Sequence, residues 1–219
     1  MSARAQLQYL HDELEKLKEQ KLYQKLRVLA GEQVPVATFD GQRVINLSSN
    51  NYLGLTTHRA LKKAATAAVK THGVGSGAVR TIAGTMDIHL ALEEQIARFK
   101  NTEACVVFQS GFVANAGTVQ AILGEGDLIV SDALNHASII DGGRLSKAER
   151  RIFRHKDLKH CEEILKETEN HAGRKLLITD GVFSMDGDIA PLPALCELAE
   201  KYNCIMMVDD AHASGVLGR

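Results

Sequence analysis

Four short polar segments of this sequence carry side chains that could do chemistry. They are residues 109–112, 132–136, 180–184 and 209–212, and each follows an apolar run typical of a β-strand. These segments contain carboxylates, imidazoles and hydroxyls, the groups that proteins use to hold protons and orient ligands. Ligands of open parallel sheets bind beyond the carboxyl ends of the strands. Four such segments in succession therefore favour a functional site at one sheet edge over four unrelated turns.

The first and last segments suit a ligand with a phosphate and a cationic ring. Residues 110–112 end one expected strand and open a helix, and the free N–H groups at a helix start can cradle a phosphate. Asp209 ends a very apolar strand, where a carboxylate needs a partner such as a protonated ring nitrogen. Pyridoxal phosphate enzymes use an aspartate in that role. His136 could stack on the flat ring, and His212 could orient the carboxylate or contact the same ligand.

An alternation of strands and helices must position these segments. The expected strands cover residues 104–108, 128–131, 151–153, 176–179 and 205–208. The expected helices cover residues 58–72, 87–100, a segment from 111, 137–147, 158–170 and 191–202. This order predicts an α/β fold with a mostly parallel sheet that helices cover on both faces.

A smaller N-terminal segment, residues 1–48, precedes the main domain, which we expect over residues 49–219. Its first part, residues 2–29, places leucines at helical spacing and predicts an amphipathic helix. Its second part predicts a β-hairpin, because Asp40-Gly41 lies between two short β-rich runs.

Composition excludes several classes of protein. The 219 residues carry 26 basic and 27 acidic side chains, a formal net charge of −1, which argues against a general nucleic-acid or membrane-surface binder. None of the four cysteines forms a C-x-x-C pair, so neither a zinc ribbon nor a thioredoxin-type motif is expected, and the length of the chain and the spacing of its cysteines argue against a disulfide framework. The N-terminal segment lacks a secretory pattern, and we expect a cytoplasmic protein.

The segments also resemble a known family when taken in order. The matching stretches are residues 49–55, 75–80, 84–85, 110–115, 131–138, 180–187 and 208–212. They resemble the α-oxoamine synthases, which are pyridoxal phosphate enzymes of the aspartate aminotransferase fold type I. The sequences of residues 79–85 and 133–142 are most similar to the glycine C-acetyltransferase branch. The resemblance implies a large domain with a mostly parallel sheet and pyridoxal 5′-phosphate as cofactor.

The resemblance implies roles for seven residues. Those that hold the cofactor are Gly111 and Phe112 through backbone amides to its phosphate, His136 stacked on its ring, Ser184 and His212 near its phenolic oxygen, and Asp209 on its ring nitrogen. Asn50 would help to hold the carboxylate of the amino-acid substrate. The catalytic set would be His136, Asp209 and His212, with no metal ion.

The resemblance further implies a condensation of glycine with acetyl-CoA to 2-amino-3-oxobutyrate and CoA, by a homodimer when full length. One alternative is the 8-amino-7-oxononanoate synthase reaction, which uses alanine and a pimeloyl donor. Another is a non-catalytic truncated product.

One family feature is absent from the sequence. The lysine that bonds to the cofactor follows the Asp209 strand in this family, on a Gly/Ser-Lys-Ala segment, and the sequence stops at Arg219 first. Lys147 lies in a similar Ser-Lys-Ala stretch, but it precedes Asp209 and falls in an expected helix, so we set it aside. We therefore expect the large domain to be incomplete, without the C-terminal small domain, and inactive by itself.

Other enzyme classes fit less well. Residues 73–77 are glycine-rich, but they are not G-x-G-x-x-G and follow a helical segment, which disfavours a dinucleotide-binding dehydrogenase. No G-x-S-x-G motif suggests a serine hydrolase, and the nine histidines lack metal-binding spacing.

Overall fold

The computed structural model describes residues 5–218 and divides the chain into two compact units, Met1–Ala67 and Ala68–Arg219. The predicted division into residues 1–48 and 49–219 stays a prediction.

The first unit begins with a shorter helix than the sequence pattern predicts. A 3₁₀ turn, Ala5–Leu7, leads into α1, Gln8–Glu19, so the predicted helix over 2–29 is wrong in its second half, while residues 2–4 lie outside the described part. The helix stops because Lys21 adopts a left-handed φ of 58° and the N–H of Leu22 donates back to the carbonyl of Leu17 at 2.8 Å. This closing pattern satisfies carbonyls that the helix end would otherwise leave free.

A small antiparallel sheet follows in the order β1-β2-β3, formed by Leu29–Ala30, Val36–Phe39 and Gln42–Ile45. The predicted hairpin is confirmed. Asp40 and Gly41 both have positive φ, 50° and 79°, as a two-residue hairpin turn requires. A 3₁₀ turn, Leu55–Thr57, then leads to α2, Arg59–His72, close to its predicted bounds.

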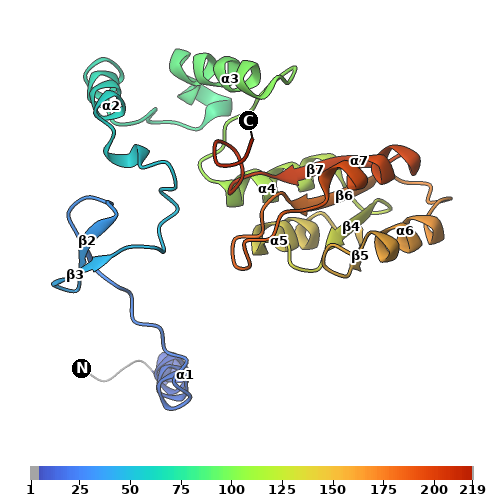
Figure 1. Cartoon of the computed structure of the whole chain (residues 1–219), viewed down its shortest axis with the longest axis horizontal. Coiled ribbons are helices and arrows are strands. Elements are labelled where there is room, and N and C mark those ends of the chain that lie inside the picture. Colours follow the sequence, from blue (N-terminus) through green and yellow to red (C-terminus); the bar gives the residue numbers. More distant parts are fainter. Residues whose placement is uncertain (1–4, 219) are drawn as a thin grey trace. The chain divides into compact units, whose positions relative to one another are not determined.

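The second unit is built on a four-stranded parallel sheet in the order β5-β4-β6-β7 (Figure 1). These strands are β4 Leu128–Asp132, β5 Glu149–Phe153, β6 Lys175–Asp180 and β7 Ile205–Asp209. Every residue of β6 is buried, as expected of a central strand with both faces covered. The α/β fold with a parallel sheet is thereby confirmed.

Helices cover both faces of this sheet because successive strand residues point to opposite sides. On one face, Leu128 and Leu177 pack in a core with α6, Leu158–Glu167, and α7, Leu192–Lys201. On the other face, Ile129 and Leu176 pack in a core with side chains from α4 and α5. Of these two helices, α4 spans Gly111–Ile122 and α5 spans Ala137–Leu145.

One predicted strand does not form. Residues 104–108 have no strand neighbour within the described part of the chain, and the N–H of Val107 instead donates to the Glu93 carboxylate at 3.0 Å. Glu93 belongs to α3, Asp87–Lys100, which follows a π-helical turn at Arg80–Gly84. Lys100, the last residue of α3, forms an ion pair of 2.9 Å with Asp210, just after β7. An apolar β-rich run forms a strand only where another strand is available to pair with it.

Candidate active site

Three neighbouring strands end in aspartates at the same edge of the sheet. Asp132, Asp180 and Asp209 are the last residues of β4, β6 and β7, and Asp180 and Asp209 are register partners. Three of the four predicted polar segments therefore converge as expected. The fourth, residues 109–112, follows no strand but opens α4, and the next turn of α4 contacts Asp209.

The Asp209 carboxylate is held by neutral donors. Its Oδ2 accepts a hydrogen bond of 2.7 Å from Asn115 Nδ2, and its Oδ1 accepts one of 3.0 Å from the N–H of Ala211. No ion pair to Asp209 occurs among residues 5–218. A half-buried carboxylate fixed in this way has a favourable place for a cationic ligand group.

His136 presents an exposed ring on an anchored backbone. Its N–H donates to Asp180 Oδ2 at 3.0 Å, and its Nδ1 lies 2.7 Å from Ser138 Oγ. The same Nδ1 accepts from the N–H of Ser138 at 3.2 Å, so the histidine caps the start of α5. The ring is thus fixed at one edge and open on the remainder, as stacking on a flat ligand would require.

A buried asparagine explains why these strand ends keep their spacing. Asn135 Nδ2 donates to the carbonyl of Ile178 at 2.9 Å, and its Oδ1 accepts from the N–H of Asp180 at 2.9 Å. These two bonds continue the pairing between β4 and β6 past the last ladder residue. They satisfy backbone groups that would otherwise be unpaired in the protein interior.

Burial and the neighbouring Asp209 charge raise the pKa of Asp180 to about 6, against a smaller opposing effect of the His136 N–H. The folded protein therefore binds this proton more tightly than the unfolded chain, whose aspartates titrate near about 4. The resulting stabilisation is complete below about pH 4 and is lost as the pH rises through about 6.

This shift predicts a pH-dependent effect of Asp180→Asn. The free energy of unfolding of the variant relative to that of the unmodified chain should increase by about 1–3 kcal/mol between pH 4 and pH 7. Urea denaturation at several pH values measures it. A difference that stays constant over this range would contradict the raised pKa.

The start of α4 fits an anion. Ser110 caps the helix, since its Oγ accepts from the N–H of Val113 at 3.2 Å. No acceptor for the N–H groups of Gly111 and Phe112 is found within residues 5–218. A Cβ built on Gly111 would meet nothing within 4 Å, so space is open in front of these donors. Free N–H groups at a helix start favour phosphate binding.

The two remaining cofactor residues lie in turns near this edge. Ser184 is exposed in the turn between β6 and α7, and His212 follows β7, close enough to lower the pKa of Asp180 by its charge. The turn with Ser184 is anchored by His155, whose Nδ1 contacts Asp132 at 2.9 Å and whose Nε2 contacts Asp188 at 3.1 Å. Burial of the ring lowers the pKa of His155, but the two carboxylates outweigh this effect and raise the pKa above its usual value.

Two further residues from the sequence lie elsewhere. Asn50 belongs to the first unit, where it is exposed and lines a cavity of about 560 Å³ with Ser48 and Thr56. Its role toward a substrate carboxylate stays a prediction. Lys147 follows the end of α5, with a left-handed φ of 62°, so the predicted helix over 137–147 is two residues too long. It precedes β5 and therefore lies toward the amino ends of the strands, which agrees with setting it aside.

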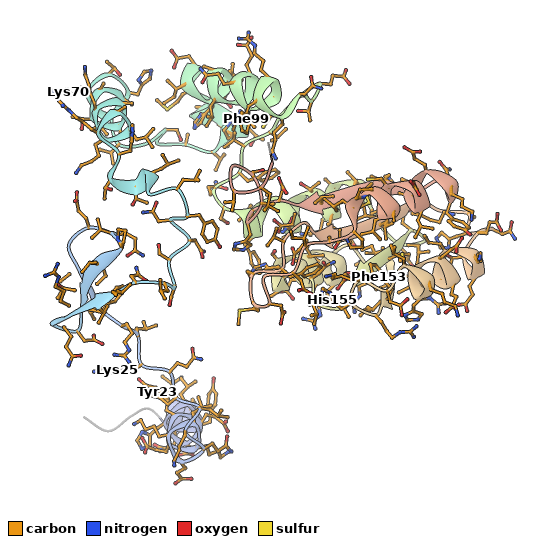
Figure 2. The ribbon with its side chains drawn as sticks, in the orientation of Figure 1. Tyr23, Lys25, Lys70, Phe99, Phe153 and His155 are labelled. Atoms are coloured by element: carbon orange, nitrogen blue, oxygen red, sulfur yellow. The ribbon has the colours of Figure 1, made fainter. Side chains whose placement is uncertain are left out.

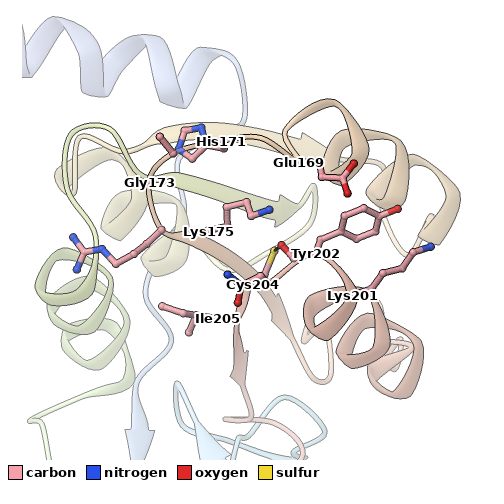
Figure 3. Close-up of a pocket in the computed structure, with 11 residues that line it drawn as sticks. Glu169, His171, Gly173, Lys175, Lys201, Tyr202, Cys204 and Ile205 are labelled. Atoms are coloured by element: carbon pink, nitrogen blue, oxygen red, sulfur yellow. Dashed lines mark hydrogen bonds between the residues drawn. The ribbon is translucent and has the colours of Figure 1, made fainter.

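A larger cavity, about 600 Å³, lies at the opposite edge of the sheet (Figure 3). It is lined by residues around the amino ends of β6 and β7, among them Lys175, Tyr202 and Cys204. None of the predicted cofactor residues lines it. No group of three or more His, Cys, Asp or Glu side chains that could hold a metal ion occurs within residues 5–218. No helix in this part of the chain is long and apolar enough to cross a membrane.

The family model for aminotransferase class I and II matches residues 42–219, which include the whole sheet of the second unit. The chain belongs to this aminotransferase family. Within the class I and II family it falls in the α-oxoamine synthase group, so the resemblance drawn from the motifs is confirmed at that level, and this family depends on pyridoxal phosphate.

Two curated relatives of high identity are both 8-amino-7-oxononanoate synthases. The 8-amino-7-oxononanoate synthase of Alkaliphilus metalliredigens is 57% identical over 213 residues, 97% of this chain and 54% of the relative. That of Thermoanaerobacter pseudethanolicus is 56% identical and covers 100% of this chain and 55% of the relative. The chain thus spans about half the length of the curated relatives it matches.

Solved structures of the family agree with the fold. Serine palmitoyltransferase of Sphingomonas wittichii has a TM-score of 0.84 at 31% identity, over 95% of this chain and 52% of that protein. The 8-amino-7-oxononanoate synthase of Francisella tularensis has a TM-score of 0.61 at 29% identity, over 74% of this chain and 43% of that protein. The enzyme activity named for the curated relatives supports the alternative drawn from the sequence better than the glycine C-acetyltransferase branch.

Sequence reasoning missed four residues of this site, namely Asn115, Asn135, Ser138 and Asp180 as groups that hold the others in place. All four lie inside the motifs that carried the resemblance, and Asn115 lies one helical turn after Gly111. That spacing was the available signal, but it did not reveal which side chains would meet.

Proposed function

We propose that this chain is part of a pyridoxal phosphate-dependent acyltransferase that condenses alanine with a pimeloyl donor, the 8-amino-7-oxononanoate synthase reaction. The observation that carries the proposal is the 57% identity, over 97% of the chain, to a relative with that name. Full-length members of this group are expected to act as homodimers.

The residues at the sheet edge fit the cofactor. Gly111 and Phe112 offer free N–H groups for its phosphate, and the exposed ring of His136 offers a stacking surface. Asp209 offers a carboxylate, fixed by two hydrogen bonds, for a protonated ring nitrogen. Ser184 and His212 would supply polar contacts to the ring oxygen.

Each of these groups has a defined physical task. Pyridoxal phosphate, when bound, supplies a cationic ring that withdraws electrons from the Cα atom of an amino acid. The Asp209 carboxylate would hold the proton on the ring nitrogen, and this would keep the ring cationic. His136 would cover one face of the ring and exclude water there. The start of α4 would hold the phosphate and so set the position of the ring.

The substrates can be tested on the full-length gene product. CoA release should be faster by at least about tenfold with alanine and pimeloyl-CoA than with glycine and acetyl-CoA, a difference of about 1.4 kcal/mol in transition-state stabilisation. Faster turnover of glycine with acetyl-CoA would instead establish the glycine C-acetyltransferase reaction, which the sequence of residues 133–142 favours. No turnover of either pair would refute both.

A further inference from the structure

A chain of buried hydrogen bonds links Asp209 to His136. Asn115 Nδ2 donates to Asp209 Oδ2 at 2.7 Å and also contacts Ser138 Oγ at 2.9 Å. Ser138 Oγ in turn lies 2.7 Å from His136 Nδ1. Asn115 and Ser138 are 5% and 0% exposed, so water does not compete for these bonds. The link runs from the end of β7 through α4 to the start of α5.

The chemistry of the donors gives this chain of bonds one direction. A carboxylate only accepts, so the amide of Asn115 must turn its nitrogen toward Asp209, and that nitrogen has two hydrogens and accepts none. Its second hydrogen goes to Ser138 Oγ, which therefore acts as acceptor there. The single hydroxyl hydrogen of Ser138 is left free to point at His136 Nδ1.

The backbone independently requires the same protonation of the histidine. The N–H of Ser138 also donates to His136 Nδ1 at 3.2 Å, so two donors converge on this nitrogen. A ring nitrogen that receives donors carries a lone pair and no hydrogen. The proton of the neutral ring must then be on Nε2, at the exposed side of the ring.

From this geometry we propose that Asn115 and Ser138 are positioning residues that hold His136 as the Nε2–H tautomer and couple its orientation to that of Asp209. The tautomer follows from contacts within the second unit alone. Only the use of the ring against pyridoxal phosphate rests on the proposed function. His136, expected on the face of the cofactor ring, and Asp209, expected at its nitrogen, are thus fixed by one hydrogen-bond network through Asn115 and Ser138.

Nitrogen NMR of the histidine side chains in the 219-residue chain, without cofactor, tests the tautomer. At about pH 8, where an ordinary histidine is neutral, His136 Nδ1 should resonate as a fully bare nitrogen and Nε2 as a protonated one. Ser138→Ala removes one of the two donors, and both resonances should then shift toward the averaged positions of a mixture of tautomers. Ser146→Ala, a buried hydroxyl deletion just after the same helix, should leave them unchanged.

Two results would overturn the proposal. One is a hydrogen on Nδ1 in the unmodified chain, and this measurement stands even if the Ser138 variant does not fold. The other is a folded Ser138→Ala variant, by circular dichroism, whose His136 resonances match those of the unmodified chain.

A second variant tests the coupling to Asp209. Asn115→Ala should weaken pyridoxal phosphate binding by roughly tenfold, because the carboxylate loses a charge-assisted hydrogen bond, and should also shift the His136 resonances. Weaker binding with unchanged resonances would refute the coupling. Failure of the unmodified full-length gene product to bind pyridoxal phosphate would count against the proposed function, while the tautomer would still be decided by the NMR result.

Discussion

Replacing Asp209 by asparagine is expected to weaken the binding of pyridoxal phosphate by about 10- to 100-fold. A hydrogen bond to a charged group contributes about 1.5–3 kcal/mol, and each factor of ten corresponds to about 1.4 kcal/mol. Asparagine keeps the size of the side chain but removes the negative charge that would face the ring nitrogen. Titration of the chain with pyridoxal phosphate, followed by absorbance, measures the change.

Asp186 provides a matched control for this substitution. Asp186→Asn makes the same chemical change at an exposed carboxylate in the turn between β6 and α7, and it should leave the affinity within about twofold. Equal effects of the two substitutions would show that general charge, and not the position of Asp209, governs binding. The assignment of Asp209 to the ring nitrogen would then be wrong.

Replacing Phe153 by alanine is expected to have the largest effect on stability, a loss of about 3–5 kcal/mol in the free energy of unfolding. Phe153, labelled in Figure 2, is 0% exposed at the end of β5, in the core beneath α6 and α7. Alanine would leave a cavity that the surrounding leucines cannot fill without moving. Urea denaturation monitored by circular dichroism measures the loss.

The neighbouring residue provides the control. Ile152 is 60% exposed on the opposite face of the same strand, so Ile152→Ala should cost at most about 1 kcal/mol. Comparable losses for the two variants would contradict the face assignment of β5.

The sequence predicted most of the elements because their periodicity is local. The strands and helices from Gly111 onward begin and end within a few residues of their expected bounds, since each apolar run is buried where its pattern requires. The two failures, the helix over 2–29 and the strand over 104–108, have different causes, one local and one non-local. A helix end depends on the conformation of one residue, Lys21, and a strand depends on a neighbour that the sequence does not identify.

By itself, then, the sequence determined the α/β class, the sheet edge that carries the polar segments and the family, because these depend on periodicity and on motifs of adjacent residues. Only the tertiary structure decided how the side chains meet. Asn115 and Asp209 are 94 residues apart in sequence and 2.7 Å apart in space, and Asp180 shifts its pKa because β6 and β7 bring two carboxylates together in a buried place. Hydrogen-bond direction and proton position depend on such distances, and residue spacing along the chain does not encode them.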